Sequence, residues 1–220
     1  MGTLYTTALS ANGRKALAAV RHLALDLEVV EVNVYRGEGQ SAAYRALNPL
    51  GKIPTLVDGD FVLWESNAIL AYLSDAYGGG ALLGKTARER ADVLRWMFWE
   101  GSHWQPALIR VLAPRVGQVL FSTPGEPVTP PWDDAELGVS LRLLGSVLQS
   151  RRFVCGDEIS AADFAVAGMT TYFGAAGFPE EAHPSIAAWL RRMDDLPAWA
   201  STAVAPWSAG AGARSPIEKR

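Results

Sequence analysis

The sequence predicts an α/β domain with the element order βαβαββα, followed by an all-helical domain. Two observations lead to this prediction. Up to the glycine run at residues 78–80, short apolar runs alternate with helical patterns, whereas from Thr86 onward the apolar residues show helical spacing and no clear strand period. We therefore place the α/β domain at residues 1–80, the helical domain at residues 86–207, and a tail rich in Gly, Ala and Ser at residues 208–220.

The α/β domain is expected to begin with a strand and a helix. Residues 3–8 form a short β run, and residues 13–26 carry Leu17, Val20 and Leu23 at helical spacing. The other expected elements are a strand at residues 28–34, a helix at residues 40–47, two strands at residues 55–57 and 61–64 around the turn Asp58-Gly59-Asp60, and a helix through residues 68–77 with Ser66 as its N-cap.

The composition excludes several classes of protein. Hydrophobic residues make up 49% of the 220 residues, but no uninterrupted apolar run is long enough to cross a membrane and no secretory signal is found, so we expect a cytoplasmic protein without a membrane partner. A net charge of -3, with no long run of one sign, argues against nucleic acid as a partner. Cys155 is the only cysteine, which excludes an internal disulfide, a cysteine metal cluster and a CxxC pair, and we expect no metal. Thiol chemistry would therefore use a thiol from outside the chain.

Three separated segments of the sequence carry a resemblance to a known family. In chain order they are SANGRK at residues 10–15, NPLGKIPTLVDGDFVLWESNAILAYL at residues 48–73, and GDEISAADF at residues 156–164. They resemble the cytosolic glutathione S-transferases, which are detoxification enzymes, and the similarity covers roughly residues 3–200. The resemblance implies a thioredoxin-like first domain that binds glutathione as cosubstrate, a helical domain that supplies the second-substrate pocket, and a homodimer. In the third segment, Ser160 and Asp163 also have the spacing of a capping box.

Ser10 and Asn12 are the candidates for activating glutathione. A free thiol with a pKa of about 8.5 must lose about two pKa units to ionise at neutral pH, which takes about 2.7 kcal/mol of preferential thiolate stabilisation. A hydroxyl at the start of a helix supplies a hydrogen bond and the positive end of the helix dipole, although Ser10 fits a plain N-cap equally well. Asn12-Gly13 resembles the T-x-N-G-x-K start of bacterial glutathione transferases that reduce disulfides, so Asn12 competes for the same role.

A second feature of the resemblance is the turn Ile53-Pro54, which is similar to the family's cis-proline turn. In that turn the residue before proline offers its backbone N–H and C=O to the cysteinyl unit of glutathione. An ordinary turn proline is the alternative interpretation. Glu65 and Ser66 lie at a strand-to-helix junction, where free N–H groups favour an anion, so Ser66 would bind the γ-glutamyl carboxylate and Glu65 the ammonium group.

At the glycyl end of glutathione, Lys52 would pair with the carboxylate and Gln40 would donate a hydrogen bond to it. Here the chain departs from related serine-type enzymes, because they often have a His-Lys pair where this sequence has Gln40-Ser41. The glycyl contacts are therefore expected to differ from theirs. A solvated surface lysine is the alternative interpretation of Lys52.

The second-substrate pocket is expected along the first long helix of the helical domain. Trp96, Trp99 and His103 share one face of that helix, and we expect Trp99 and His103 to line the pocket. The same stripe also fits a core or a dimer interface.

The sequence thus predicts a glutathione transferase that conjugates a small hydrophobic electrophile. A glutathione-dependent disulfide or peroxide reductase, and a non-catalytic binding module of the same fold, are the alternatives.

Overall fold

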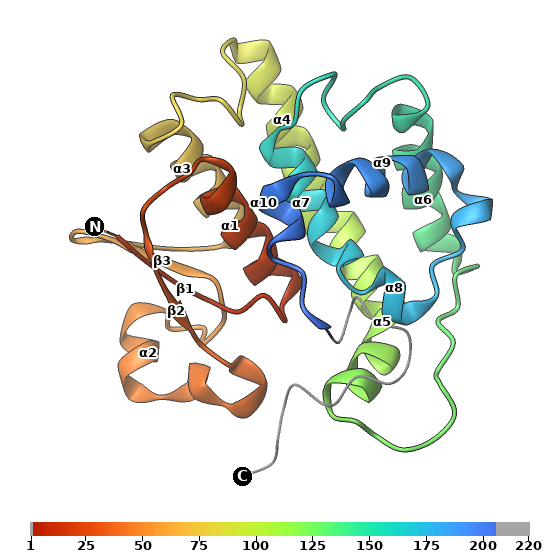
Figure 1. Ribbon diagram of the computed structural model, residues 1–220, viewed down its shortest axis with the longest axis horizontal. Coiled ribbons are helices and arrows are strands. Elements are labelled where there is room, and N and C mark those ends of the chain that lie inside the picture. Colours follow the sequence, from red (N-terminus) through yellow and green to blue (C-terminus); the bar gives the residue numbers. More distant parts are fainter. Residues whose placement is uncertain (1, 206–220) are drawn as a thin grey trace.

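The computed structural model describes residues 2–205, which form a small four-stranded sheet packed beside a larger set of helices (Figure 1). The strands lie in the order β2-β1-β3-β4. β1 runs parallel to β2 and antiparallel to β3, and β3 and β4 form the expected hairpin. Their bounds are Thr3–Thr6 for β1, Glu28–Glu31 for β2, Thr55–Asp58 for β3 and Phe61–Trp64 for β4.

The two faces of the sheet are covered differently, because side chains alternate along each strand. Leu4 of β1 and Leu56 of β3 are buried with residues of α1 and α3. Tyr5 lies in a separate small cluster with Tyr44 of α2. The helices are α1 (Ala11–His22), α2 (Ala42–Leu47) and α3 (Ser66–Ala76), with 3-10 turns at Val34–Arg36 and Glu38–Gln40. The order βαβαββα is therefore confirmed.

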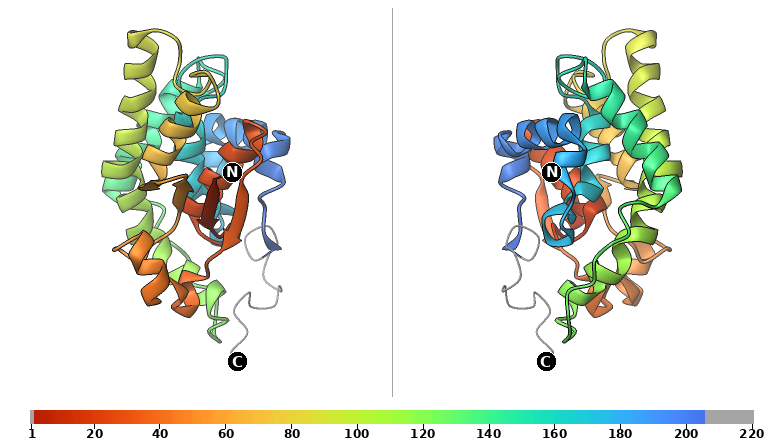
Figure 2. Two further views of the ribbon diagram at one scale, coloured as in Figure 1. Left: turned by 90° about the vertical axis from the view of Figure 1, so that its left-hand side faces the viewer. Right: turned by 90° about the vertical axis from the view of Figure 1, so that its right-hand side faces the viewer.

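The rest of the described chain is helical, as the sequence predicts. α4 and α5 are joined through a π-helical turn into one long column along one side of the molecule (Figure 2). No helix of residues 2–205 combines the length and the hydropathy that crossing a membrane requires. The bounds are Ala87–Trp99 for α4, Glu100–Trp104 for the π turn, Gln105–Leu120 for α5, Ala135–Leu148 for α6, Ala161–Thr170 for α7, Phe173–Ala176 for α8, Glu180–Ala182 for a 3-10 turn, Pro184–Asp194 for α9 and Pro197–Ala200 for α10.

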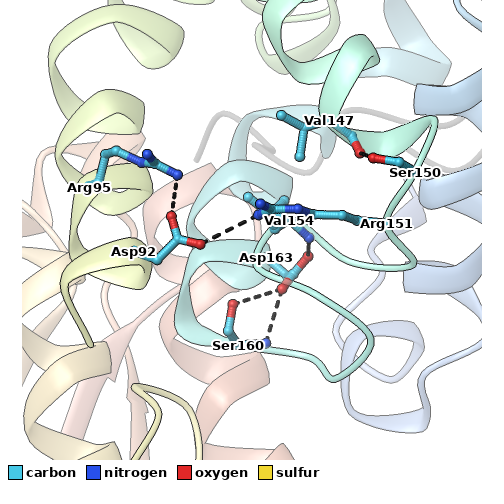
Figure 3. Close-up of polar contacts among 8 residues, drawn as sticks. All are labelled: Asp92, Arg95, Val147, Ser150, Arg151, Val154, Ser160 and Asp163. Carbon is cyan, nitrogen blue, oxygen red and sulfur yellow. Dashed lines mark hydrogen bonds and ion pairs between the residues drawn. The ribbon is translucent and has the colours of Figure 1, made fainter. Parts of the chain in front are cut away.

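The capping box expected at the start of α7 is present (Figure 3). Asp163 is fully buried and accepts hydrogen bonds from the backbone N–H of Ser160 at 3.0 Å and of Val154 at 2.8 Å. The indole N–H of Trp189 in α9 donates to the same carboxylate at 3.1 Å. Burial raises the pKa of Asp163, and these hydrogen bonds act in the opposite direction. One side chain thus joins the start of α7, the preceding loop and α9.

Several element bounds differ from the prediction because of local capping. The strand expected at residues 28–34 ends at Glu31, since Asn33 accepts hydrogen bonds from two backbone N–H groups and starts a 3-10 turn. The helix expected at residue 40 begins at Ala42, since Ser41 is its N-cap. The N-cap predicted at Ser66 is wrong: Glu65 takes that position with φ 75°, and Ser66 is the first residue of α3. The predicted tail at residues 208–220 lies outside the described residues.

Candidate functional site

A cleft of about 260 Å³ lies where the α/β domain meets the π turn and α5. It is lined on one side by the start of α1, the loop before β3, and the junction between β4 and α3. The opposite wall comes from the helical domain. The lining residues are Asn12, Lys15, Asn48, Leu50, Lys52, Ile53, Pro54, Trp64, Glu65, Ser66, Asn67, Glu100, Gly101, Gln105, Pro106 and Ile109. The sequence proposes eight residues that bind glutathione or activate its thiol. Six of them line this cleft: Asn12, Lys52, Ile53, Pro54, Glu65 and Ser66.

The start of α1 presents Asn12 to the cleft. The Ser66 hydroxyl donates a hydrogen bond to the Asn12 carbonyl oxygen at 3.3 Å, which fixes the orientation of the amide group. The amide nitrogen of Asn12 then has no hydrogen-bond partner among residues 2–205. It is a free donor at the N-terminal end of a helix, where a thiolate is also favoured by the helix dipole.

Ser10 is the N-cap of α1. Its hydroxyl oxygen accepts a hydrogen bond from the backbone N–H of Gly13 at 3.4 Å, and Ser10 is half-buried without lining the cleft. Ser10 also forms a side-chain hydrogen bond with Tyr35. Burial raises the pKa of the Tyr35 hydroxyl, and this hydrogen bond acts in the opposite direction. The Tyr172 hydroxyl binds the backbone on both sides of Ser10, accepting from Ala11 N–H at 2.9 Å and donating to the Leu9 carbonyl at 3.3 Å. The helical domain therefore holds the loop that carries Ser10.

Gly13 lets α1 approach the end of β1 closely. A Cβ on Gly13 would lie 2.2 Å from the carbonyl oxygen of Thr7 and 2.6 Å from the hydroxyl of Thr6. No other residue type fits this contact without moving the helix away from the strand. Gly13 is therefore required for the packing of α1 against β1, whereas Asn12 beside it is a candidate for the chemistry.

The Ile53-Pro54 peptide bond is cis, as the resemblance implies. Two hydrogen bonds hold this turn in place. The Lys52 carbonyl accepts them from the Tyr44 hydroxyl at 2.7 Å and from the Asn48 side chain at 2.8 Å. Within residues 2–205, no hydrogen bond uses the backbone N–H or C=O of Ile53. Both groups are available to a peptide ligand in the cleft.

The residues expected at the two ends of glutathione differ in exposure. Ser66 lines the cleft and is buried, whereas Glu65 beside it lines the cleft and is exposed. Lys52 is exposed and lines the cleft. Gln40 is exposed and is not a lining residue, but its amide group packs over Gly51, next to Lys52.

A buried ion pair in the cleft was not predicted from the sequence. Lys15 of α1 and Glu100 of the π turn lie 3.1 Å apart between Nζ and Oε2, and each side chain is 1% exposed. The Asn67 amide nitrogen donates to the same Glu100 oxygen at 2.9 Å and to the Met97 carbonyl at 2.9 Å. Lys15 belongs to the SANGRK segment, but no sequence signal pairs it with a residue so far along the chain.

The structure places Trp99 and His103 away from this cleft. Trp99 stacks on Trp104 with ring centroids 5.6 Å apart and packs against the helical core, and His103 is exposed. The helical wall of the cleft consists of the π turn and of Gln105, Pro106 and Ile109 instead.

Comparison with known proteins identifies relatives over about nine-tenths of the chain. Residues 1–75 match the family model "Glutathione S-transferase, N-terminal domain", and residues 137–192 match "Glutathione S-transferase, C-terminal domain". The chain is 31% identical over 204 residues to glutathione S-transferase F10 of Arabidopsis thaliana, covering 90% of this chain and 94% of that protein. It is 33% identical to glutathione S-transferase theta-1 of Homo sapiens, covering 87% of this chain and 81% of that protein. Among solved structures, glutathione transferase F7 of Populus trichocarpa superposes with a TM-score of 0.81 at 27% identity, over 92% of this chain and 98% of that one.

Proposed function

Because the chain belongs to the glutathione S-transferase family and is a glutathione transferase, we propose that the cleft at the start of α1 binds glutathione and ionises its thiol. The observation that carries this proposal is the free amide nitrogen of Asn12, which faces the cleft at the N-terminal end of α1. The half-buried Ser10 precedes Asn12 by two residues, as the N-cap of the same helix.

The thiolate is stabilised by hydrogen-bond donation and by the helix dipole. The thiol proton leaves to solvent, and the resulting sulfur anion accepts a hydrogen bond from the Asn12 amide, while the Ser10 hydroxyl, which does not line the cleft, is the competing candidate donor. A pKa two units below the free value corresponds to about 2.7 kcal/mol, which a hydrogen bond to the anion and a helix N-terminus supply. Cys155 takes no part, because burial raises the pKa of its thiol to about 12 and it lies outside the cleft.

The other lining residues of the cleft complement the peptide and carboxylate groups of glutathione. The free backbone groups of Ile53 next to cis-Pro54 pair with the cysteinyl unit. Ser66, buried at the N-terminal end of α3, binds the γ-glutamyl carboxylate, and Glu65 stands beside the ammonium group. Lys52 pairs with the glycyl carboxylate, and Gln40 approaches the same end of the ligand.

The second substrate is a small hydrophobic electrophile. The thiolate attacks its electrophilic carbon, so that a carbon–sulfur bond forms while the leaving group departs with the bonding electron pair. Pro106 and Ile109 give the helical wall of the cleft an apolar surface that supports this choice. Trp99 and His103 remain predicted contributors to the second-substrate pocket. The Asn12-Gly13 pair also favours disulfide reduction as a second activity. The thiolate attacks one sulfur of the disulfide while the other sulfur leaves as a thiolate, and a second glutathione thiolate then attacks the glutathione sulfur of the mixed disulfide, so that oxidised glutathione and the reduced substrate are released.

A homodimer is the proposed assembly. Large apolar side chains are exposed on the edge strand β4, where Phe61 is 45% and Trp64 40% exposed, and on α4, where Phe98 is 71% exposed. Exposed aromatic residues in such numbers support a protein interface. We expect light scattering to give twice the chain mass, and Phe98→Glu to shift the equilibrium to monomers. The cytoplasmic location expected from the sequence remains a prediction.

The test of the proposed function is the pKa of bound glutathione. Ultraviolet difference spectra of the thiolate, recorded against pH, are compared for wild type, Ser10→Ala and Asn12→Ala. We expect wild type to lower the thiol pKa well below the free value, and the variant that removes the main donor to return it toward that value with at least about a tenfold loss of turnover. Glutathione that binds wild type with an unshifted thiol pKa would refute the proposal.

A further inference from the structure

A chain of three hydroxyl groups connects the helical domain to the start of α1. Tyr172, which is buried between α7 and α8, accepts a hydrogen bond from the Ala11 N–H at 2.9 Å and donates to the Leu9 carbonyl at 3.3 Å. Tyr35, in the 3-10 turn after β2, forms side-chain hydrogen bonds with Tyr172 and with Ser10. Its side chain packs against the helical core. The Ser10 hydroxyl is therefore connected to the helical domain through two tyrosines.

Each of these hydroxyl groups has one hydrogen to donate, and this sets the direction of the chain. Burial raises the pKa of both tyrosines, so each keeps its hydrogen at neutral pH. The Tyr172 hydrogen goes to the Leu9 carbonyl, so Tyr172 accepts from Tyr35 as well as from the Ala11 N–H. The Tyr35 hydrogen is used in that contact, and Tyr35 can then only accept from Ser10.

The position of Ser10 agrees with this direction. Its oxygen accepts from the Gly13 N–H at 3.4 Å, and Ser10 does not line the cleft, whereas Asn12 does. We propose that Tyr35 and Tyr172 are positioning residues that hold the Ser10 hydrogen on Tyr35 and so leave the ionisation of the glutathione thiol to Asn12. This inference rests on the proposed function of the cleft.

The opposite direction of the chain would have the opposite effect on the thiol. If Tyr172 donated to Tyr35 and Tyr35 donated to Ser10, the Ser10 hydrogen would be available to the sulfur atom, and both tyrosines would strengthen Ser10 as a donor. That direction takes the Tyr172 hydrogen away from the Leu9 carbonyl. Removal of the Tyr35 hydroxyl distinguishes the two, because it releases the Ser10 hydrogen in the first case and weakens Ser10 as a donor in the second.

The experiment measures the pKa of the glutathione thiol bound to the full-length protein, by thiolate absorbance against pH. The variants are Tyr35→Phe, Ser10→Ala, Asn12→Ala and the double variant Tyr35→Phe/Ser10→Ala. Tyr35→Phe keeps the ring and removes only the hydroxyl group. Tyr77→Phe is the matched control, because Tyr77 lies at the C-terminal end of α3 and its hydroxyl binds Asp58. Ser10→Gly repeats the Ser10 measurement with a smaller loss of helix capping.

We expect Tyr35→Phe to lower the thiol pKa by about one unit, because the released Ser10 hydrogen turns to the thiolate, and the double variant to reverse this shift. In the otherwise unchanged protein, Ser10→Ala and Ser10→Gly should shift the pKa by less than about half a unit, and Asn12→Ala should raise it by about one unit or more. Tyr77→Phe should leave it unchanged.

A thiol pKa that rises or stays unchanged in Tyr35→Phe overturns the inference. A larger rise in both Ser10 variants, or no rise in Asn12→Ala, does the same. Lost packing at Tyr35 would not lower the thiol pKa in a way that depends on Ser10, so the double variant separates positioning from stability. Failure of the proposed function is a separate result, since it shows as an unshifted thiol pKa in wild type.

Discussion

Gly13→Ala is expected to destabilise the protein by moving α1 away from β1. The new Cβ would lie 2.2 Å from the Thr7 carbonyl oxygen, well under the 3.0 Å that Cβ contacts keep, and this neighbour is backbone that has no rotamer to change. Relieving the contact needs a shift of roughly 1 Å, for which overpacking costs about 3 kcal/mol. Alanine recovers about 1 kcal/mol through its higher helix propensity, so the net loss is about 2 kcal/mol.

Urea unfolding followed by tryptophan fluorescence measures this loss, and the melting temperature should fall by about 4–8 °C. Gly117→Ala is the matched control, because Gly117 lies within α5 and a Cβ there meets nothing within 4 Å. The control should be stabilised by about 0.5–1 kcal/mol. The displaced helix also carries Asn12, so Gly13→Ala should lose turnover beyond its loss of stability. A Gly13→Ala protein as stable as the Gly117→Ala protein would refute the packing argument.

Two further predictions concern residues outside the cleft. Asp163→Ala should cost about 3 kcal/mol or more, because it leaves the buried N–H groups of Val154, Ser160 and Trp189 without an acceptor; equilibrium unfolding checks this, and an unchanged midpoint would contradict it. Alkylation of Cys155 by iodoacetamide at pH 8 should be about a hundredfold or more slower in the native protein than in urea, because burial raises the pKa of this thiol to about 12 and only the thiolate reacts. Equal rates in the two states would show that the thiol is accessible and ionised.

The fold was predictable from the sequence because its signals are local. The period of apolar residues changes from strand to helix within a few residues, and the capping box at Ser160 and Asp163 is contained in four positions. The N-cap of α3 was predicted at the wrong residue, because that prediction depended on local propensity alone. Glu65 takes a positive φ that is rare for a residue with a side chain, and propensity favours Ser66 as the cap.

The site was predictable only where one segment carries the contacts. Ile53-Pro54 and Glu65-Ser66 lie within one motif, whereas Lys15 and Glu100 are 85 residues apart and meet through tertiary packing. A buried lysine is uncommon unless it is paired, so the place of Lys15 among the buried positions of α1 was the available signal. Trp99 lies outside the cleft because it stacks on Trp104 against the helical core, a tertiary contact that the helical spacing alone does not predict.

The π turn connects the two halves of the proposed reaction site. At its first residue, Glu100 reaches Lys15 of α1 and Asn67 of α3. At its last residue, the indole N–H of the fully buried Trp104 donates to the Val166 carbonyl of α7 at 3.0 Å. The next residues, Gln105 and Pro106, form the helical wall of the cleft. Because both ends of the turn are anchored by buried polar contacts, the turn fixes where Gln105 and Pro106 lie relative to α1 and α3, and thereby sets the distance between the glutathione side and the helical wall of the cleft.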